Sequence, residues 1–463
     1  MNTVALSATA AVSERAAPRD PAASPRRQNA ALRRILLIAP HGSYRTAPFL
    51  AAAKTRGIDV LIASEAKHSL VSAYAQGLHL NLDDPQASLQ AILREAQRQP
   101  FAAVLGCDDA STELAALAAS ELGLPHNPTT AVRLARRKDL AREQLAKAGV
   151  PVPRHWRLDL RRPLAAQTGN IRFPCVLKPV ALSASRGVIR ANNVAELTHA
   201  TARIQVLLTR AGLHDAEERE IILVEEFIPG FEVAVEGLLT HGQLEILIIF
   251  DKPDPLDGPY FEETYYITPS RLDASTQQAL LETISATCAA YGLREGPIHA
   301  ECRINAQGVW ILEVAARTIG GLCGRLLRFG TGSSLEELVL LHALGERPAL
   351  NSETASGPSL DRGPRLGPIG EPGGAGVLMI PIPQAGILRR VEGVSAAEKV
   401  PYIEEVVIDV REGYELVPLP EGSSYLGFIF ARAPSAAQAE TALRTAHACL
   451  HVVVMPLWQG VGV

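Results

Sequence analysis

Two glutamates in one predicted β-hairpin are the residues of this sequence best suited to hold a metal ion. Glu301 and Glu313 lie in two apolar runs joined by the segment 306–308, and a three-residue turn there pairs Asn305 with Val309. Counting along the strands places Glu301 opposite Glu313, where like charges about 5 Å apart repel each other. Mg²⁺ would relieve this repulsion, since it binds one or two carboxylates together with substrate phosphates. A hairpin that exposes two acidic residues to solvent is the alternative interpretation.

A lysine near the end of a second predicted strand suits phosphate binding. Lys178 follows a short apolar run and precedes a loop of small residues that contains Ser183, Ser185 and Gly187. Backbone N–H groups of such a loop can approach a phosphate, while the lysine ammonium supplies positive charge. A solvated lysine at a strand end is the alternative.

A third segment takes an apolar strand into an acidic and aromatic turn. The run 221–224 leads into Glu225, Glu226, Phe227 and Ile228, and a Pro-Gly pair then precedes a further glutamate at position 232. A base can pair with exposed backbone groups at such a break, and a carboxylate can accept hydrogen bonds from ribose hydroxyl groups. A strand that leaves the core for a polar loop would show the same pattern.

Together with the segment 136–139, and in their order along the chain, the three segments resemble the ATP-grasp superfamily, and the resemblance covers roughly residues 34–345. Within the superfamily the chain looks most like the L-amino-acid ligase branch, on the segments 251–264, 296–301 and 421–427. The resemblance implies an ATP-dependent carboxylate–amine ligase. In such an enzyme a substrate carboxylate attacks the γ-phosphate of ATP, and an amine then displaces phosphate from the acyl phosphate to form an amide.

The resemblance also implies roles for individual residues. Those matched to ATP binding are Lys138, Lys178, Ser183, Ser185, Gly187, Glu225, Glu226, Phe227, Ile228 and Glu232. Among them Lys138 and Lys178 would hold the phosphates, and Glu232 would bind the ribose. The adenine would lie against the hinge formed by residues 225–228. Glu301 and Glu313 would bind Mg²⁺ or Mn²⁺.

Two residues are candidates for catalysis. Arg317 matches an arginine that faces the reacting carboxylate or phosphate in this superfamily. His299 lies beside the predicted metal hairpin and could take a proton from the attacking amine, but a hydrogen-bonded structural histidine fits the sequence equally well.

The sequence departs from the superfamily pattern at two places. Ala315 stands where many members have an asparagine that serves as a further metal ligand, so the second metal would depend on Glu313, phosphates and water. Leu182 and Ala184 stand where relatives often have glycine, which predicts a stiffer phosphate loop.

Three other hypotheses compete with the ligase. A carboxylation that uses bicarbonate, as in biotin carboxylase, ranks second because the sequence contains no biotinyl carrier segment. A phosphotransferase would stop at a phosphorylated product. A nucleotide-binding module without catalysis is suggested by Ala315. The sequence does not identify the carboxylate, the amine or the general base.

Composition places the chain among ordinary globular proteins. Of its 463 residues 47% are hydrophobic and 20% are charged, and the net charge of −4 gives no electrostatic reason to expect nucleic acid or a membrane as partner. No apolar run approaches the 18 or so residues of a transmembrane helix. The six cysteines form no Cys-x-x-Cys pair, which predicts small core residues and a cytoplasmic location. The partners are therefore expected to be small molecules, with a homodimer possible.

The order of predicted elements divides the chain into an α/β and α+β multidomain protein with an ATP-grasp fold. Residues 1–30 predict a disordered tail, and residues 31–130 predict a Rossmann-like domain of alternating strands and helices. Residues 131–349 predict the ATP-grasp domain, with a lid at about 150–226 and one helical segment over 131–149. Residues 350–376 read as a Gly- and Pro-rich linker or loop, and residues 377–463 as a small α+β domain.

Polar side chains follow the third strand of the predicted Rossmann-like domain. Asp108, Asp109 and Ser111 would lie in the crevice at the carboxyl ends of the strands, where they could touch a substrate. The alternative, which we favour, is that they cap the helix predicted at 112–122.

Overall fold

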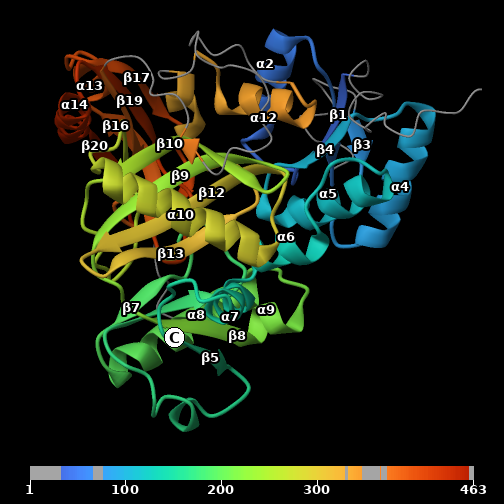
Figure 1. Ribbon diagram of the computed structural model, residues 1–463. Coiled ribbons are helices and arrows are strands. Elements are labelled where there is room, and N and C mark those ends of the chain that lie inside the picture. The colour runs from blue at the N-terminus through green and yellow to red at the C-terminus, as the bar shows by residue number, and fades with distance from the viewer. Residues whose placement is uncertain (1–32, 66–76, 329–331, 347–364, 367–372, 458–463) are drawn as a thin grey trace, which may run out of the picture.

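A computed structural model describes residues 33–65, 77–328, 332–346, 365–366 and 373–457 of the chain (Figure 1). The predicted tail 1–30 and most of the predicted linker 350–376 lie outside these residues. Within the described part no helix is long and apolar enough to cross a lipid bilayer. All six cysteines are free, and all except Cys449 are buried, as expected for small core residues.

A parallel four-stranded sheet forms the N-terminal domain. Its strands, in spatial order, are β3 (Gly77–His79), β2 (Asp59–Ser64), β1 (Arg34–Ile38) and β4 (Ala103–Gly106). Its helices are α2 (Thr46–Arg56), α4 (Pro85–Arg98) and α5 (Asp109–Glu121). All five residues of β1 are buried, because helices cover both faces of such a parallel sheet. The Rossmann-like architecture is confirmed, although neither β3 nor α4 was predicted.

The helical segment predicted over 131–149 is two helices, α6 (Thr129–Arg136) and α7 (Lys138–Lys147). The chain breaks at Arg137, whose backbone is extended at φ −96° and ψ 97°. The buried Arg137 guanidinium donates hydrogen bonds to Asp139 at 3.1 Å and to Glu217 at 3.0 Å. The sequence contains no glycine or proline at this break. The break is stabilised instead by contacts with residues distant in the sequence, so the local sequence does not reveal it. The single helix was therefore wrong, and the break makes Lys138 the first residue of α7.

A separate antiparallel sheet contains the predicted phosphate strand and the hinge strand. Its order is β5 (His155–Asp159), β8 (Ile221–Glu226), β6 (Cys175–Pro179) and β7 (Ile189–Ala191). The helices of this region are α8 (Val194–Arg210) and α9 (Ala216–Glu220), with a short 3-10 turn η1 (Leu164–Ala166). Because β6 pairs directly with β8, Lys178 and Glu225 come from neighbouring strands.

The central sheet joins the middle of the chain to its C-terminal part. Its main path is β13 (Gly308–Ala315), β12 (Gly296–Asn305), β9 (Phe231–Thr240), β10 (Gln243–Lys252), β11 (Tyr265–Thr268), β15 (Gly374–Ile380), β19 (Gly427–Ala433) and β17 (Ile403–Ile408). The short β14 (Arg365–Leu366) pairs with β10. Antiparallel pairing of β11 with β15 makes the C-terminal strands an extension of this sheet.

Helices cover the central sheet, and a smaller sheet completes the fold. The helices are α10 (Ala274–Tyr291), which lies across β9, β12 and β13 in Figure 1, α12 (Leu335–Ala343), α13 (Val394–Ala397) and α14 (Ala436–Ala448), with the 3-10 turn η2 (Cys323–Leu326). The smaller sheet has the order β18 (Glu415–Leu416), β16 (Gly386–Glu392) and β20 (His451–Met455). The sequence predicts strands over 377–382, 406–410 and 427–431 and a helix over 436–450, which correspond to β15, β17, β19 and α14, but it predicts none of the three strands of the smaller sheet.

The β12–β13 hairpin reaches the predicted opposition of its glutamates by a different route. Asn305 pairs with Gly308, so the turn has two residues instead of three and the predicted pairing of Asn305 with Val309 is wrong. The Asn305 side chain accepts the backbone N–H of Gln307 at 2.9 Å, which stabilises the tighter turn. A β-bulge between positions 301 and 302 then restores the register, and Glu301 pairs with Glu313 as predicted.

Candidate active site

The predicted site residues converge on one cavity of about 600 Å³, within the usual range for small-molecule sites of about 300–1,000 Å³. The predicted residues that line it are Lys138, Lys178, Ser183, Ser185, Glu225, Glu226, Phe227, Ile228, Glu232, His299, Glu301, Glu313 and Arg317. Gly187 does not line the cavity. Its backbone N–H donates to the carbonyl oxygen of Pro420 at 2.8 Å, so it holds the phosphate loop against the C-terminal part of the chain.

Lys178 belongs to a group of buried charges on the lid side of the cavity. Its Nζ lies 2.7 Å from one carboxylate oxygen of Glu225, and the Nε of Arg142 lies 2.5 Å from the other. Burial alone would raise the pKa of Glu225, but Arg142 and Lys178 together lower it to about 2. We call Arg142, Lys178 and Glu225 the cationic cluster, because its two cations outnumber its one carboxylate. The Glu225 side chain serves to position Lys178.

Lys138 links the phosphate loop to the metal hairpin. Its Nζ lies 3.0 Å from the Glu313 carboxylate and donates a hydrogen bond to the carbonyl oxygen of Leu182 at 2.8 Å. Since Lys138 begins α7, the break at Arg137 is what directs its side chain to this place. The Glu313 carboxylate is therefore neutralised by an ammonium group in this structure.

The phosphate loop adopts a conformation that its sequence does not favour. Ala184 and Ser185 have φ angles of 56° and 52°, in the left-handed region that costs most residues roughly 1–2 kcal/mol. The loop is held from outside, because Arg186 Nε donates to the carbonyl oxygen of Glu421 at 3.0 Å and the Gly187 N–H donates to Pro420. Contacts with the C-terminal part thus replace the missing glycines in shaping the loop.

An arginine missed by the sequence analysis organises the hinge. The buried Arg303 donates to the carbonyl oxygen of Ile228 at 2.8 Å and to the Glu232 carboxylate at 2.9 Å, and its guanidinium lies 5.0 Å from the centre of the Phe227 ring. Arg303 is two residues beyond Glu301 on β12, so both side chains point to the same face of the strand. The alternation of side chains along the strand was therefore the sequence signal that could have identified Arg303.

Three carboxylates surround one ammonium group at the central sheet. Lys252 Nζ lies 2.9 Å from each of Glu232, Glu263 and Glu301, whose oxygen atoms lie within 4.8 Å of one another. Burial would lower the pKa of Lys252, but the three carboxylates raise it well above its usual value. We call these four residues the acidic cluster. Each oxygen of Glu232 accepts one hydrogen bond here, one from Lys252 and one from Arg303, and each retains a further lone pair for a ribose hydroxyl.

His299 is fully engaged by carboxylates. Its Nδ1 lies 2.6 Å from Glu236, and its Nε2 lies 3.5 Å from Glu301. Burial would lower the pKa of His299, but Glu236 and then Glu301 raise it to about 9. A protonated imidazole is a poor acceptor for the proton of an amine at neutral pH. The arrangement corresponds to the structural histidine that the sequence also allowed.

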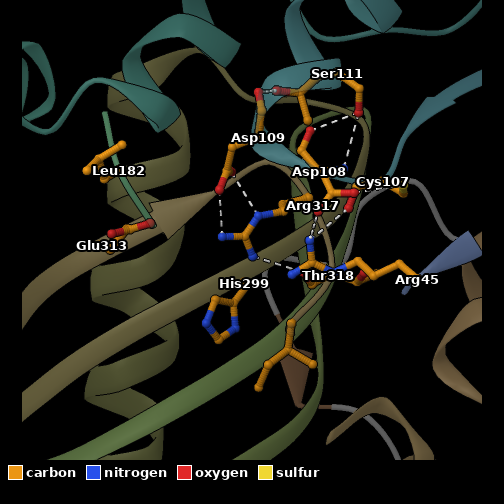
Figure 2. Close-up of polar contacts among 12 residues, drawn as sticks. Arg45, Cys107, Asp108, Asp109, Ser111, Leu182, His299, Glu313, Arg317 and Thr318 are labelled. Carbon is orange, nitrogen blue, oxygen red and sulfur yellow. Dashed lines mark hydrogen bonds and ion pairs between the residues drawn. The ribbon is translucent and has the colours of Figure 1, made fainter. Parts of the chain in front are cut away.

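Arg317 is anchored by the N-terminal domain. It donates to both oxygens of Asp109, at 2.8 and 2.9 Å, and to the carbonyl oxygen of Thr318 at 3.0 Å (Figure 2). Burial would lower the pKa of Arg317, but Asp109 raises it, so the guanidinium stays charged. Asp108 occupies the N-cap position of α5, as expected for a helix cap, whereas Asp109 serves a tertiary ion pair.

Carboxylates on the central sheet fit a hard divalent cation. Glu301 and Glu313 face the cavity from opposed positions, and each is balanced by one lysine, Lys252 and Lys138 respectively. Oxygen donors of this kind suit Mg²⁺ or Mn²⁺ once an ammonium gives way. Ala315 is buried opposite His299 and offers no ligand atom, which agrees with the departure noted in the sequence.

Comparison with known families agrees with this architecture. The ATP-grasp N-terminal domain matches residues 50–126, the ATP-grasp domain matches residues 171–325, and the L-amino acid ligase C-terminal domain 2 matches residues 378–455. The chain belongs to the ATP-grasp superfamily. The ATP-grasp match spans the phosphate loop, the hinge, the metal hairpin and Arg317, which together line the cavity.

Individual relatives of this ATP-grasp chain cover different shares of it. A solved L-amino acid ligase from Bacillus licheniformis has the same fold, with a TM-score of 0.74 and 24% identity over 91% of this chain and 99% of that one. Carnosine synthase 1 from Gallus gallus is 30% identical over 66% of this chain and 34% of its own length. Dapdiamide A synthase from Enterobacter agglomerans is 26% identical over 50% of this chain and 54% of its own length. The chain therefore spans only about a third to a half of these two curated relatives.

Proposed function

We propose that this chain is an ATP-dependent ligase that joins the carboxylate of an amino acid to an amine and releases ADP and phosphate. The observation that supports this most is the meeting of two opposite environments in one cavity. The cationic cluster and Lys138 suit the phosphates of ATP, while the acidic cluster suits a cation or an ammonium group. Relatives named D-alanine–D-alanine ligase and alanine–anticapsin ligase are consistent with amino-acid substrates.

The first step requires positioning and charge neutralisation more than covalent help. The substrate carboxylate attacks the γ-phosphate, so one P–O bond forms and the bond to ADP breaks. In this proposal Lys138 and Lys178 hold the phosphates, and Ser183 and Ser185 donate hydrogen bonds to them. Phe227 and its apolar neighbours in the hinge bind the adenine, and Glu232 accepts hydrogen bonds from the ribose hydroxyl groups.

A divalent cation, Mg²⁺ or Mn²⁺, would neutralise phosphate charge when bound by Glu301 and Glu313. Two lysines orient these carboxylates, since Lys138 pairs with Glu313 and Lys252 pairs with Glu301. Glu263 brings a third carboxylate close to Glu301, which offers a ligand in place of the asparagine replaced by Ala315.

In the second step the amine attacks the acyl carbon, phosphate leaves, and the amide forms. Arg317 faces the cavity with Asp109 behind it, so its charge can stabilise the negative charge that develops on the reacting group. In this proposal His299 orients Glu301 and does not accept the proton.

We further propose small-molecule partners, without nucleic acid or membrane, and a cytoplasmic location in keeping with six free cysteines. The division into 31–130, 131–349 with a lid at 150–226, and 377–463 is part of the same proposal. A homodimer is compatible with it.

One assay tests the function: release of phosphate and of ADP, both measured with ATP, Mg²⁺ and pairs drawn from a panel of amino acids. Phosphate release that depends on a second, amine-bearing substrate is the expected result. Release that needs only bicarbonate would indicate carboxylation, and ADP formed without phosphate would indicate a phosphotransferase. Nucleotide binding without turnover for any pair would contradict the ligase and favour a binding module.

A further inference from the structure

Arg45 is a second arginine of the cavity that the ATP-grasp motifs do not include. It lies in the segment between β1 and α2, and its side chain is only 12% exposed. One nitrogen, Nη1, donates to the carbonyl oxygen of Cys107 at 3.2 Å and to the Asp108 carboxylate (Figure 2). The Asp108 carboxylate also accepts hydrogen bonds from the Ser43 hydroxyl at 2.5 Å and from the Cys107 thiol at 3.2 Å, so its negative charge is shared among three partners.

Among the arginines that line the cavity, Arg317 and Arg45 use different edges of their guanidinium groups. Arg317 grips Asp109 through Nε and Nη2, the side-on edge that matches both oxygens of a carboxylate. Arg45 binds Asp108 through Nη1, and its Nε is buried without a hydrogen-bond partner among the residues described. A buried donor without a partner is costly, so an edge of this kind in a cavity wall suggests that a ligand completes it.

A glycine leaves room beside this unused edge. A Cβ atom on Gly320 would lie 3.0 Å from Nη2 of Arg45 and 2.7 Å from the hydroxyl oxygen of Tyr44. Gly320 has no positive φ angle, so its backbone does not require glycine, and the two close contacts are with the ends of flexible side chains. Arg45, Tyr44 and Gly320 all line the cavity, so this edge of the guanidinium lies in the cavity wall.

We propose that Arg45 binds the free α-carboxylate of the amine substrate, so that the acceptor is an amino acid and not a simple amine or an amide. This inference rests on the proposed ligase function. The cationic cluster and Lys138 are assigned to phosphates and Arg317 to the reacting group, which leaves Arg45 for the one remaining anion. An amino acid held there by its carboxylate presents its amino group to the rest of the cavity, where the acidic cluster attracts it.

The test compares each of the standard L-amino acids, as amine substrate, with its primary amide. Kinetics are measured in the wild-type protein, in Arg45→Met, and in Arg45→Lys, which keeps the positive charge but lacks the paired N–H donors of the guanidinium group. We expect the wild type to prefer the acids by at least tenfold in kcat/KM. Arg45→Met should raise KM for the acids by about 10- to 100-fold and leave KM for the amides and for ATP within about threefold. Arg45→Lys should lie between the two.

Arg33→Met is the matched control. Arg33 also lies in the N-terminal domain and also has a buried Nε without a described partner, but it pairs with Glu346 and is not among the residues lining the cavity. This variant should leave the preference for acids unchanged. Thermal unfolding of all variants verifies that they fold.

Two outcomes overturn the inference while the ligase function stands: equal use of acids and amides by the wild type, or equal loss with both in Arg45→Met. A third outcome is that Arg45→Met loses activity only when the activated substrate is an amino acid with a side-chain carboxylate. Arg45 would then bind the activated substrate and not the amine substrate, and the inference would also be wrong. Calorimetric titration of the same acids and amides in the presence of a non-hydrolysable ATP analogue and Mg²⁺ covers the case without turnover. If acids bind and this binding depends on Arg45, the proposed carboxylate site stands even though the ligase function fails. If acids do not bind, or bind without Arg45, the proposed carboxylate site is refuted.

Discussion

Two groups of buried charge face the same cavity, and they differ in balance. The cationic cluster has two cations, Arg142 and Lys178, around the single carboxylate of Glu225. The acidic cluster has one ammonium, that of Lys252, among three carboxylates. Each keeps its charges paired, which lowers the cost of burying them.

The difference in balance indicates what each cluster can accept. A group with surplus positive charge remains attractive to an anion such as phosphate after its internal pairing, and a group with surplus negative charge remains attractive to Mg²⁺ or an ammonium group. A ligase needs both on the two sides of one reacting carboxylate. The two clusters also predict different responses to the loss of a single charge.

The largest effect is expected where the acidic cluster meets the metal hairpin. Glu301→Gln and Glu313→Gln should each reduce Mg²⁺-dependent turnover by about 10³-fold or more, because neutral amides cannot replace ionised oxygen ligands. Turnover and circular dichroism are measured together, with the exposed Glu404→Gln on β17 as control. If Glu263→Gln abolishes turnover and Glu313→Gln does not, the metal ligands are those of the acidic cluster alone.

Arg317 is a cation outside both clusters, and its removal should affect catalysis more than binding. Arg317→Met is expected to lower kcat by about 10²–10³-fold, the usual cost of losing one preorganised charge in the transition state. Steady-state kinetics at saturating ATP give the comparison, with Arg317→Lys as the conservative variant. A change confined to KM would assign Arg317 to ground-state binding instead.

The lysines at the centres of the clusters provide the direct comparison in stability. Lys252→Met removes the one cation that contacts all three carboxylates, leaving Arg303 beside Glu232 and His299 beside Glu301, and should destabilise the fold by about 3–5 kcal/mol. Lys178→Met should cost only about 1 kcal/mol, because Arg142 still pairs with Glu225. Mg²⁺ or Mn²⁺ should raise the thermal midpoint of Lys252→Met more than that of the wild type, since the cation can replace the ammonium. Equal losses of unfolding free energy in Lys252→Met and Lys178→Met would contradict the proposed difference between the two clusters.

An effect that appears only on acidification concerns the pair that anchors Arg317. Burial would raise the pKa of Asp109, but Arg317 lowers it from an ordinary value near 3.8 to about 2. The ionised carboxylate therefore stabilises the folded protein above about pH 4, and this contribution of about 2 kcal/mol is lost as pH falls toward 2. Thermal midpoints of the wild type and Asp109→Asn should differ at pH 7 and converge in acid. Asp83→Asn, at an exposed position, should show no such convergence.

Most of the candidate site was predictable because its residues lie in short segments whose pattern reflects local physics. Lys178, the 182–188 loop and the hinge after Val224 are each a strand and the turn that follows it, so residue order alone reveals them. Glu301 and Glu313 were found by counting along a hairpin, and their pairing held because a bulge compensated for a turn one residue shorter than predicted.

The residues that were missed act through partners far away in the sequence. Lys252 meets Glu301 across 49 positions, and Arg142 meets Glu225 across 83. Nothing around either residue distinguishes it from a solvated cation. The break at Arg137 is of the same kind, because Glu217 helps to stabilise it from 80 positions away.

By itself, the sequence determined the superfamily and the order of its main strands and helices, and it nominated candidate groups for phosphate and metal. The tertiary structure alone decided how those groups are balanced: Glu225 paired with two cations, His299 held between carboxylates, and Arg317 anchored by Asp109 from another domain. The physical reason is that hydrophobic periodicity and turn chemistry act within a few residues. Charge pairing inside a cavity depends on which side chains the completed fold brings within about 4 Å of one another.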